Sequence, residues 1–247
     1  MRRAFSIFLH NLITLFCLPS WKGWLLSLCG HNIEGSFRAG PFFYFKGQIT
    51  SQGKSRIGVG NVIACNEVRL KDARIGHFNV LSGNLNLLLK SDALIGNFNK
   101  IKRGRVFKKE VPSTLIMSDW SQITGHHYLD LACNISLGAN VVVGGRSSQF
   151  WTHGFCHLDK GKLRVMVMGD IEIGEGCYVG SACLFNPGVK IADEVNIGAG
   201  AIISKDINEQ GLVTAAPLVS RMLSLETFCE KYAISEEELR QKLRVTK

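Results

Sequence analysis

A six-residue repeat runs without a gap from residue 173 to residue 207, and it constrains the fold more than any other feature of the chain. Every sixth position holds a large apolar residue, the next position is small or short, and the position four residues on is small or apolar. The large positions are Ile173, Val179, Phe185, Ile191, Ile197 and Ile203. A period of six is typical of a parallel β-solenoid, in which each hexad supplies one short strand and one turn.

Weaker copies of the same repeat extend the predicted solenoid toward the N-terminus. Ile57-Gly58, Ile75-Gly76, Ile95-Gly96 and Leu137-Gly138 fit the pattern, and strands begin near Phe42. Residues 104–120 show no clean period, so irregular turns are expected there. Residues 155–168 also break the repeat and are expected to project as a loop. The fold class is therefore all-β, with the solenoid over 42–221.

The two ends of the chain predict helices rather than solenoid. Residues 1–41 form an apolar or amphipathic helical segment, whose uninterrupted apolar run stops at Pro19-Ser20, too short to span a bilayer. Phe and Leu side chains share one helical face and two tryptophans follow, which suits an interfacial helix on an anionic membrane. A helix that caps the solenoid or packs on a sister subunit explains the segment equally well. Residues 222–247 predict two short helices, capped at Ser224 and by the Ser235–Glu238 pair.

Composition narrows the classes of partner. The 247 residues carry a net charge of +9, which favours an anionic partner, and residues 100–110 hold six cations against one acid. Aromatic interleaving and RNA motifs are missing, so nucleic acid is not an expected partner. The eight cysteines include no CxxC pair, and Cys177 and Cys183 fall on equivalent hexad positions. Reduced thiols in a cytosolic protein, without zinc, are expected.

The hexad run, the Thr-His-Gly at 152–154 and the residues after Ile207 together resemble the hexapeptide-repeat acyltransferases. This family of left-handed parallel β-helix enzymes includes galactoside and polysaccharide O-acetyltransferases. Its members end with an Ile-Gly-Ala-Gly coil, a Lys-Asp pair and a closing arginine, which match 197–200, 205–206 and Arg221. Ala-Pro-Leu-Val at 216–219 replaces the family's Asn-Pro-Ala-Lys turn. The match is specific over 131–221 and looser over 42–130.

The resemblance implies an acetyl-CoA-dependent O-acetyltransferase that acts on a saccharide hydroxyl, as a homotrimer with active sites between subunits. It assigns the general base to His153, because the family's catalytic histidine follows a threonine where a coil opens into a loop. A neutral imidazole can accept the hydroxyl proton as the oxygen attacks the thioester. Asp119, Asp130 and Asp159 are all candidates to orient that imidazole.

Other residues are predicted to line the acceptor and donor sites. Trp151 and Thr152 adjoin the base, and Trp151 either fills the core or lines the acceptor cleft. His126 and His127 are either turn residues or part of the acceptor site, and His157 lies in the expected loop. The acyl donor, acetyl-CoA, is expected along the last coils, at Tyr178, Gly180, Ser181, Gly198, Ala199, Lys205 and Arg221.

Three alternatives to this function differ in class. The same base would serve an amino sugar, which makes the protein an N-acyltransferase. A catalytically inactive β-helix scaffold would keep the solenoid without the chemistry. A zinc enzyme of the carbonic anhydrase type needs histidines on regular coils, whereas His153 and His157 flank a broken one.

A cytoplasmic location is expected, with peripheral contact of residues 1–30 with the inner face of the membrane. A capsule, lipopolysaccharide or exopolysaccharide precursor is the expected acceptor.

Overall fold

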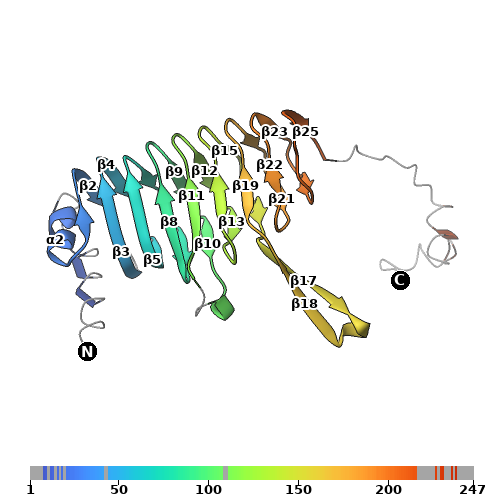
Figure 1. The fold of residues 1–247 in the computed structure, drawn as a ribbon, viewed down its shortest axis with the longest axis horizontal. Coiled ribbons are helices and arrows are strands. Elements are labelled where there is room, and N and C mark those ends of the chain that lie inside the picture. The colour runs from blue at the N-terminus through green and yellow to red at the C-terminus, as the bar shows by residue number, and fades with distance from the viewer. Residues whose placement is uncertain are drawn as a thin grey trace. The chain divides into compact units, whose positions relative to one another are not determined.

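The structure is a computed structural model that describes residues 21–41, 44–107 and 111–215, with isolated positions within 8–18 and 226–237. The chain divides into two units, Met1–Ala215 and Ala216–Lys247. The first unit is a parallel β-solenoid (Figure 1). In Figure 1 the chain rises along the front strands, turns over to the strands behind and advances toward the right, which is a left-handed winding. The predicted all-β, left-handed parallel β-helix is confirmed.

Each coil contributes a strand to three successive faces, so the cross-section is triangular. Face 1 is a nine-stranded sheet of β2 (Ser36–Ala39), β4 (Lys54–Ile57), β6 (Arg74–Ile75), β9 (Leu94–Asn97), β12 (Gln122–Gly125), β15 (Val142–Val143), β20 (Tyr178–Val179), β23 (Val195–Ile197) and β25 (Gly211–Val213). Face 2 holds β7 (Val80–Ser82), β10 (Lys100–Lys102), β13 (Tyr128–Asp130), β16 (Gln149–Phe150), β21 (Leu184–Phe185) and β24 (Ile202–Ile203). Face 3 holds β1 (Asn32–Ile33), β8 (Leu85–Leu89), β11 (Ser113–Met117), β14 (Ile135–Leu137), β19 (Ile171–Ile173) and β22 (Lys190–Ile191).

Two long strands join faces 2 and 3 at the N-terminal end. β3 (Tyr44–Gln52) and β5 (Val62–Lys71) bend from one face to the other, and their pairing shifts register between Lys46 and Gln48. The short helix α2 (Lys22–Leu28) packs at this end against β1 and β2, with Leu26 fully buried. Most of residues 1–20, where the sequence predicts the amphipathic helix, lie outside the described residues.

The core is a set of apolar columns that run along the solenoid axis. The six large hexad residues from Ile173 to Ile203 are each at most 4% exposed, which confirms their predicted inward position. The Phe150 and Phe185 rings stack with centroids 4.4 Å apart on adjacent coils. Because each buried side chain rests on its equivalent in the next coil, stability is distributed over neighbouring coil contacts.

The length of a coil varies, although the strands stay in register. On face 1, Arg74 pairs with Leu94 across a short coil, and Leu94 pairs with Gln122 across a longer one. The longest coil separates Val142 from its partner Tyr178. Both long coils carry their extra residues at the corner between faces 2 and 3, which we call the insertion corner (103–112 and 151–170).

The second insertion is a hairpin of β17 (His153–Leu158) and β18 (Leu163–Met168), joined by the 3₁₀ turn η2 (Asp159–Gly161). Its strands pair only with each other. Figure 1 shows it projecting away from the coils, which matches the loop predicted at 155–168. The first insertion contains the 3₁₀ turn η1 (Arg105–Phe107).

Two boundaries differ from those expected. The solenoid begins at Asn32, upstream of the predicted start at residue 42, because β1 and β2 already pair with β3 and β4. Residues 113–117, within the segment expected to be irregular, form the regular strand β11, where buried and half-buried residues alternate. The hexad pattern does not reveal this strand, because the length of the preceding insertion is not a multiple of six residues. Ser224, Glu238 and residues 216–221 lie outside the described residues.

Candidate active site at the insertion corner

The hairpin places His153 at its base, directly beside the preceding coil. β16 pairs with β13, with Phe150 opposite Leu129, so the residues that follow each strand also lie side by side at the corner. The Gly169 N–H donates to the Thr152 carbonyl at 3.0 Å and closes the hairpin where it leaves the coil. The sequence break at 152–154 is thus a point where the chain leaves the solenoid and later rejoins it in register.

Asp130 is the carboxylate that orients the imidazole. Asp130 Oδ2 lies 2.7 Å from His153 Nδ1, and the Asp130 side chain is 4% exposed against 21% for His153. Of the other two candidates, Asp119 accepts the Ser91 N–H, and Asp159 lies in the turn at the hairpin tip. The sequence left three aspartates as candidates, and the stacking of the coils brings Asp130 to the imidazole.

The Asp130 contact fixes which imidazole nitrogen carries the proton. An ionised carboxylate only accepts hydrogen bonds, so Nδ1 of a neutral His153 must be the N–H. Nε2 then presents a lone pair, as a general base requires. Thr152 supports the carboxylate: its fully buried hydroxyl lies 2.9 Å from both the Asp130 carbonyl oxygen and Oδ2, and it accepts the Cys133 N–H at 3.0 Å. Thr152 is thus buried against Asp130 and Cys133, with no exposed surface in the single chain.

Two phenylalanine rings flank the imidazole, and a guanidinium lies over each. Phe107 from the first insertion and Phe155 from the hairpin stand edge-on to His153, with centroid distances of 5.6 and 5.9 Å. Arg103 lies 5.4 Å from the Phe107 centroid, and Arg164 lies 3.8 Å from the Phe155 centroid. His153 therefore contacts two aromatic rings, each of which has a guanidinium over it.

His127 is built into the interior instead of the site. It belongs to a buried polar ladder at the corner between faces 1 and 2, in which a side chain accepts a backbone N–H from the next coil. Its members are Asn61, Asn79, Asn99, His127 and Ser148. The Ser148 N–H donates to His127 Nδ1 at 3.2 Å, and Nε2 lies 3.1 Å from Thr124 Oγ1. Burial lowers the pKa of His127 to about 4. An acceptor-binding role for His127 is therefore corrected to a structural one.

His126 lies outside that same corner, across face 2 from His153. Its backbone has a φ of 60°, and its ring stacks on Phe98 at 4.9 Å, which in turn stacks on Phe78 at 5.2 Å. Within one chain the structure therefore does not bring His126 to the base.

Trp151 and His157 lie closer to the base but outside the core. Trp151 is half-buried on the outer surface, 5.0 Å from the Tyr128 ring, and its Nε1–H donates to Gln149 at 3.0 Å. The core-filling alternative for Trp151 is therefore wrong. His157 is exposed, and it pairs with Arg164 on the hairpin.

The residues predicted for the acyl donor lie on the coils beyond His153. Tyr178 is exposed on face 1, and its hydroxyl lies over Gly144. Gly180-Ser181 and Gly198-Ala199 stack at the corner between faces 1 and 2. A Cβ added to Gly180 would lie 2.6 Å from the Ala199 nitrogen, so this position needs glycine for close coil stacking.

Lys205 is exposed in the turn after β24, at the insertion corner. Within one chain, Lys205 therefore lies at the same corner as His153. The Gly180-Ser181 and Gly198-Ala199 pairs lie at the corner one face away. Arg221 lies outside the described residues.

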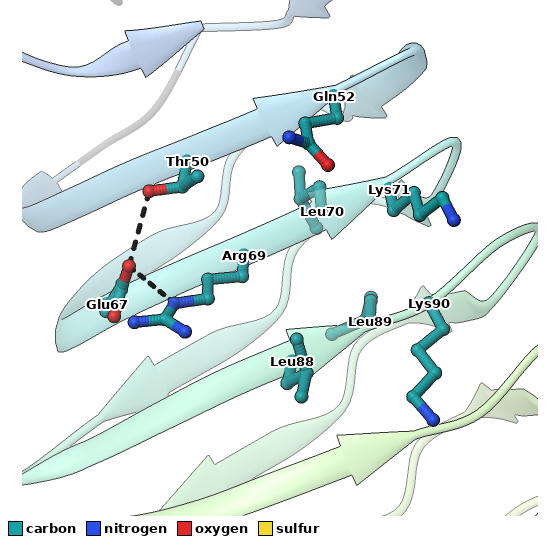
Figure 2. Close-up of a pocket in the computed structure, with 9 residues that line it drawn as sticks. All are labelled: Thr50, Gln52, Glu67, Arg69, Leu70, Lys71, Leu88, Leu89 and Lys90. Atoms are coloured by element: carbon teal, nitrogen blue, oxygen red, sulfur yellow. Dashed lines mark hydrogen bonds and ion pairs between the residues drawn. The ribbon is translucent and has the colours of Figure 1, made fainter. Parts of the chain in front are cut away.

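The hollow in Figure 2 lies away from this chemistry. It has a volume of about 320 Å³ on the outside of β3, β5 and β8, and Figure 2 shows Glu67 reaching both Thr50 and Arg69. Glu67 and Arg69 form an ion pair at 2.7 Å. Among the described residues, no group of three or more His, Cys, Asp or Glu side chains gathers to hold a metal.

The described cysteines are free thiols, and burial raises the pKa of Cys65 to about 12. Burial, reinforced by nearby Asp170, also raises the pKa of Cys133, which adjoins Thr152. The thiolate form of Cys65 and Cys133 is therefore disfavoured.

The chain is similar in sequence to two curated proteins. No protein-family model matches the chain. It is 32% identical over 83 residues to galactoside O-acetyltransferase of Escherichia coli (strain K12), covering 34% of this chain and 41% of that protein. The resemblance to hexapeptide-repeat acyltransferases is confirmed.

Two further proteins are similar over most of the chain. Bifunctional protein GlmU of Marinobacter nauticus is 25% identical over 191 residues, 74% of this chain and 39% of that protein. The solved structure of the polySia-specific acetyltransferase NeuO has a TM-score of 0.44 at 16% identity, covering 86% and 97% of the two chains. The chain spans about two fifths of the length of the two curated relatives.

Proposed function

We propose that the protein is an acetyl-CoA-dependent O-acetyltransferase that acts on a saccharide hydroxyl, with His153 as the general base. The observation that carries the proposal is the 2.7 Å contact between His153 Nδ1 and the buried Asp130 carboxylate, at a corner where both insertions leave the solenoid. The similarity to a galactoside O-acetyltransferase supports the reaction class.

The reaction follows from this arrangement. His153 Nε2 accepts the proton of the acceptor hydroxyl while its oxygen attacks the thioester carbonyl carbon. The carbonyl oxygen takes the negative charge, which backbone N–H groups at coil turns would stabilise. The C–S bond then breaks, the imidazolium returns its proton to the departing sulfur, and the products are the acetyl ester and free CoA. Asp130 stabilises the imidazolium throughout, as the buried carboxylate does in Ser-His-Asp hydrolases.

The test is CoA release by the full-length protein against a panel of saccharides that includes amino sugars. His153→Ala removes the proton acceptor and is expected to lower turnover by about 10²–10⁴-fold. His157→Ala, on the same face of the same strand, is the matched control and is expected to keep near wild-type turnover. A His153→Ala protein as active as wild type would show that the base is another residue. Acetylation of amino groups alone would make the protein an N-acyltransferase.

The N-terminal end is proposed to touch an anionic membrane surface. Trp21 at the N-cap of α2, and Trp24 and Leu28 within it, are 62%, 64% and 68% exposed, whereas Leu26 of the same helix is buried. No described helix is long and apolar enough to cross a bilayer. Trp24→Ser with Leu28→Ser leaves the buried cap intact and is expected to reduce sedimentation with anionic liposomes. Equal partitioning of variant and wild type would refute the membrane contact.

A further inference from the structure

A second hollow lies on the insertion corner itself, upstream of the base. It has a volume of about 550 Å³, and its polar lining consists of Lys46, Asn66, Asn84, Arg103 and Arg105. Three of the described lining residues are cationic and none is acidic. The outer amides are tied together, since Asn66 Nδ2 donates to Asn84 Oδ1 at 2.7 Å. The hollow therefore has a preorganised polar wall and a net positive charge.

Arg103 connects this hollow to the base. The side chain is only 7% exposed, and its Nη1 donates to the carbonyl oxygens of Asn84 at 3.0 Å and Val111 at 2.5 Å. The same guanidinium lies on the Phe107 ring, whose edge meets His153. A buried guanidinium fixed in this way keeps its position before a ligand arrives, which reduces the entropic cost of binding.

The ladder of coils gives the separation between hollow and base. Successive partners along the corner are Lys46, Ala64, Ser82, Lys102 and Asp130, and His153 lies on the next coil. Neighbouring strands are about 4.8 Å apart. Arg103, two coils from His153, is therefore about 10 Å from the base, and Lys46, five coils away, about 24 Å. A ligand held at both ends must be extended.

From these observations we infer that the hollow is an acceptor subsite for an anionic group, a carboxylate or phosphate carried by an extended saccharide. Guanidinium and ammonium groups bind such oxyanions by charge-assisted hydrogen bonds. The inference rests on the proposed function and names the acceptor class for it. The acceptor is assigned instead of the phosphates of CoA because the hollow lies on the N-terminal side of His153, whereas the positions predicted for the donor lie on the C-terminal side.

The experiment compares three acceptors of similar size: a neutral oligosaccharide, a carboxylate-bearing oligosaccharide and a glycosyl phosphate. Lys46→Gln with Arg105→Gln removes two exposed charges from the hollow, so folding is not at risk. Lys71→Gln with Lys90→Gln removes the same charge from the hollow in Figure 2 and is the matched control. Initial rates give kcat/KM for each acceptor and KM for acetyl-CoA. Binding of each acceptor to the His153→Ala protein is measured separately by calorimetry.

The wild type is expected to prefer an anionic acceptor. The hollow variant is expected to lose about 10-fold or more of kcat/KM with that acceptor. Its kcat/KM with the neutral acceptor and its KM for acetyl-CoA are expected to change little. The control variant is expected to keep wild-type values of all three quantities. Which anionic acceptor loses more identifies the group as carboxylate or phosphate. A raised KM for acetyl-CoA would assign the hollow to the donor, and equal kcat/KM values for charged and neutral acceptors would also overturn the inference. If none of the acceptors supports CoA release, but anionic saccharides still bind the His153→Ala protein, the proposed function is contradicted and the subsite stands.

Discussion

Asp130 contacts His153 through a buried carboxylate that also lies within hydrogen-bond distance of the Thr152 hydroxyl. In the proposed mechanism the carboxylate has two separate roles: it accepts a hydrogen bond from Nδ1–H, which sets the tautomer, and its negative charge would stabilise the imidazolium formed during proton transfer. An asparagine at this position can still accept through its side-chain oxygen, but it carries no charge. Replacing the aspartate by asparagine therefore separates orientation from charge.

Asp130→Asn is expected to lower kcat by about 10–100-fold or more, with a much smaller change in the KM for acetyl-CoA. The reason is that Asp130 acts on the base and not on the donor. Steady-state kinetics of CoA release measures both quantities. Asp119→Asn, which keeps the oxygen that accepts the Ser91 N–H, is the control. An unchanged kcat in Asp130→Asn would remove the carboxylate from the mechanism.

His127 predicts how stability changes with pH. Burial lowers its pKa from 6.5 to about 4, so between these values the unfolded chain binds a proton that the folded chain excludes. The free energy of unfolding therefore falls as the pH is lowered from about 6.5 to 4. His127→Asn, which follows the pattern of the ladder, is expected to reduce this pH dependence. Urea unfolding at pH 7 and pH 5 measures it, with His126→Asn as the exposed control. An equal pH dependence in His127→Asn and wild type would contradict the structural role.

The hairpin forms a sheet of its own, separate from the sheets of the solenoid. β17 and β18 pair only with each other, whereas Leu137 pairs with Ile173 across the two ends of the insertion as if nothing intervened. Six apolar residues of the hairpin are at least 40% exposed: Phe155, Leu158, Leu163, Val165, Val167 and Met168. An isolated two-stranded hairpin is only marginally stable in water. The stability of this hairpin therefore depends on contacts with other groups.

Deletion of residues 154–168 is therefore expected to leave the solenoid folded and to abolish acetyl transfer. The shortened coil would be only slightly longer than the coil from Arg74 to Leu94, which already stacks in register. Circular dichroism melting is expected to shift by only a few degrees, while CoA release falls to the level of His153→Ala. A deletion that loses cooperative unfolding would show that the hairpin stabilises the coils.

Sequence patterns predicted the elements where hexads are regular and missed them where insertions intervene. The phase from Ile173 to Ile203 is correct because no insertion interrupts these coils. The strand β11 was missed because an insertion of irregular length precedes it. The partner of His153 was left open for a similar reason, since no whole number of hexads joins it to Asp130. Only the stacking of coils decides which carboxylate faces the imidazole.

At the scale of the whole molecule, one chain brings Lys205 to the corner of His153 but leaves the predicted donor pairs Gly180-Ser181 and Gly198-Ala199 at another corner. His153 lies at the insertion corner, and Gly180-Ser181 and Gly198-Ala199 lie at the corner before it, one face away. That face is about five residues wide, roughly 16 Å at the rise of a β-strand. Active sites between the subunits of a homotrimer would bring the two corners together, and we propose that arrangement.

Mixed oligomers test it. His153→Ala lacks the base, and Ala199→Trp places a bulky side chain at an exposed turn of the proposed donor track; each variant alone is expected to be nearly inactive. If sites are shared, co-expression of the two is expected to restore part of the wild-type turnover, because some sites combine an intact base with an intact donor corner. Sedimentation velocity is expected to give a mass of three chains. A monomer, or no restoration in the mixed protein, would place the site within one chain.

The constant register of the face 1 strands, despite coils of very different length, has a consequence for how such proteins diversify. Length added at the insertion corner leaves the strand pairs on both sides unchanged, so it is nearly uncoupled from folding. The segments that carry Phe107, Phe155 and Arg164 can therefore be exchanged or lengthened while His153 and Asp130 stay in place. Substrate preference in a protein of this kind can evolve, or be engineered, by exchanging segments at the insertion corner while the coils stay unchanged.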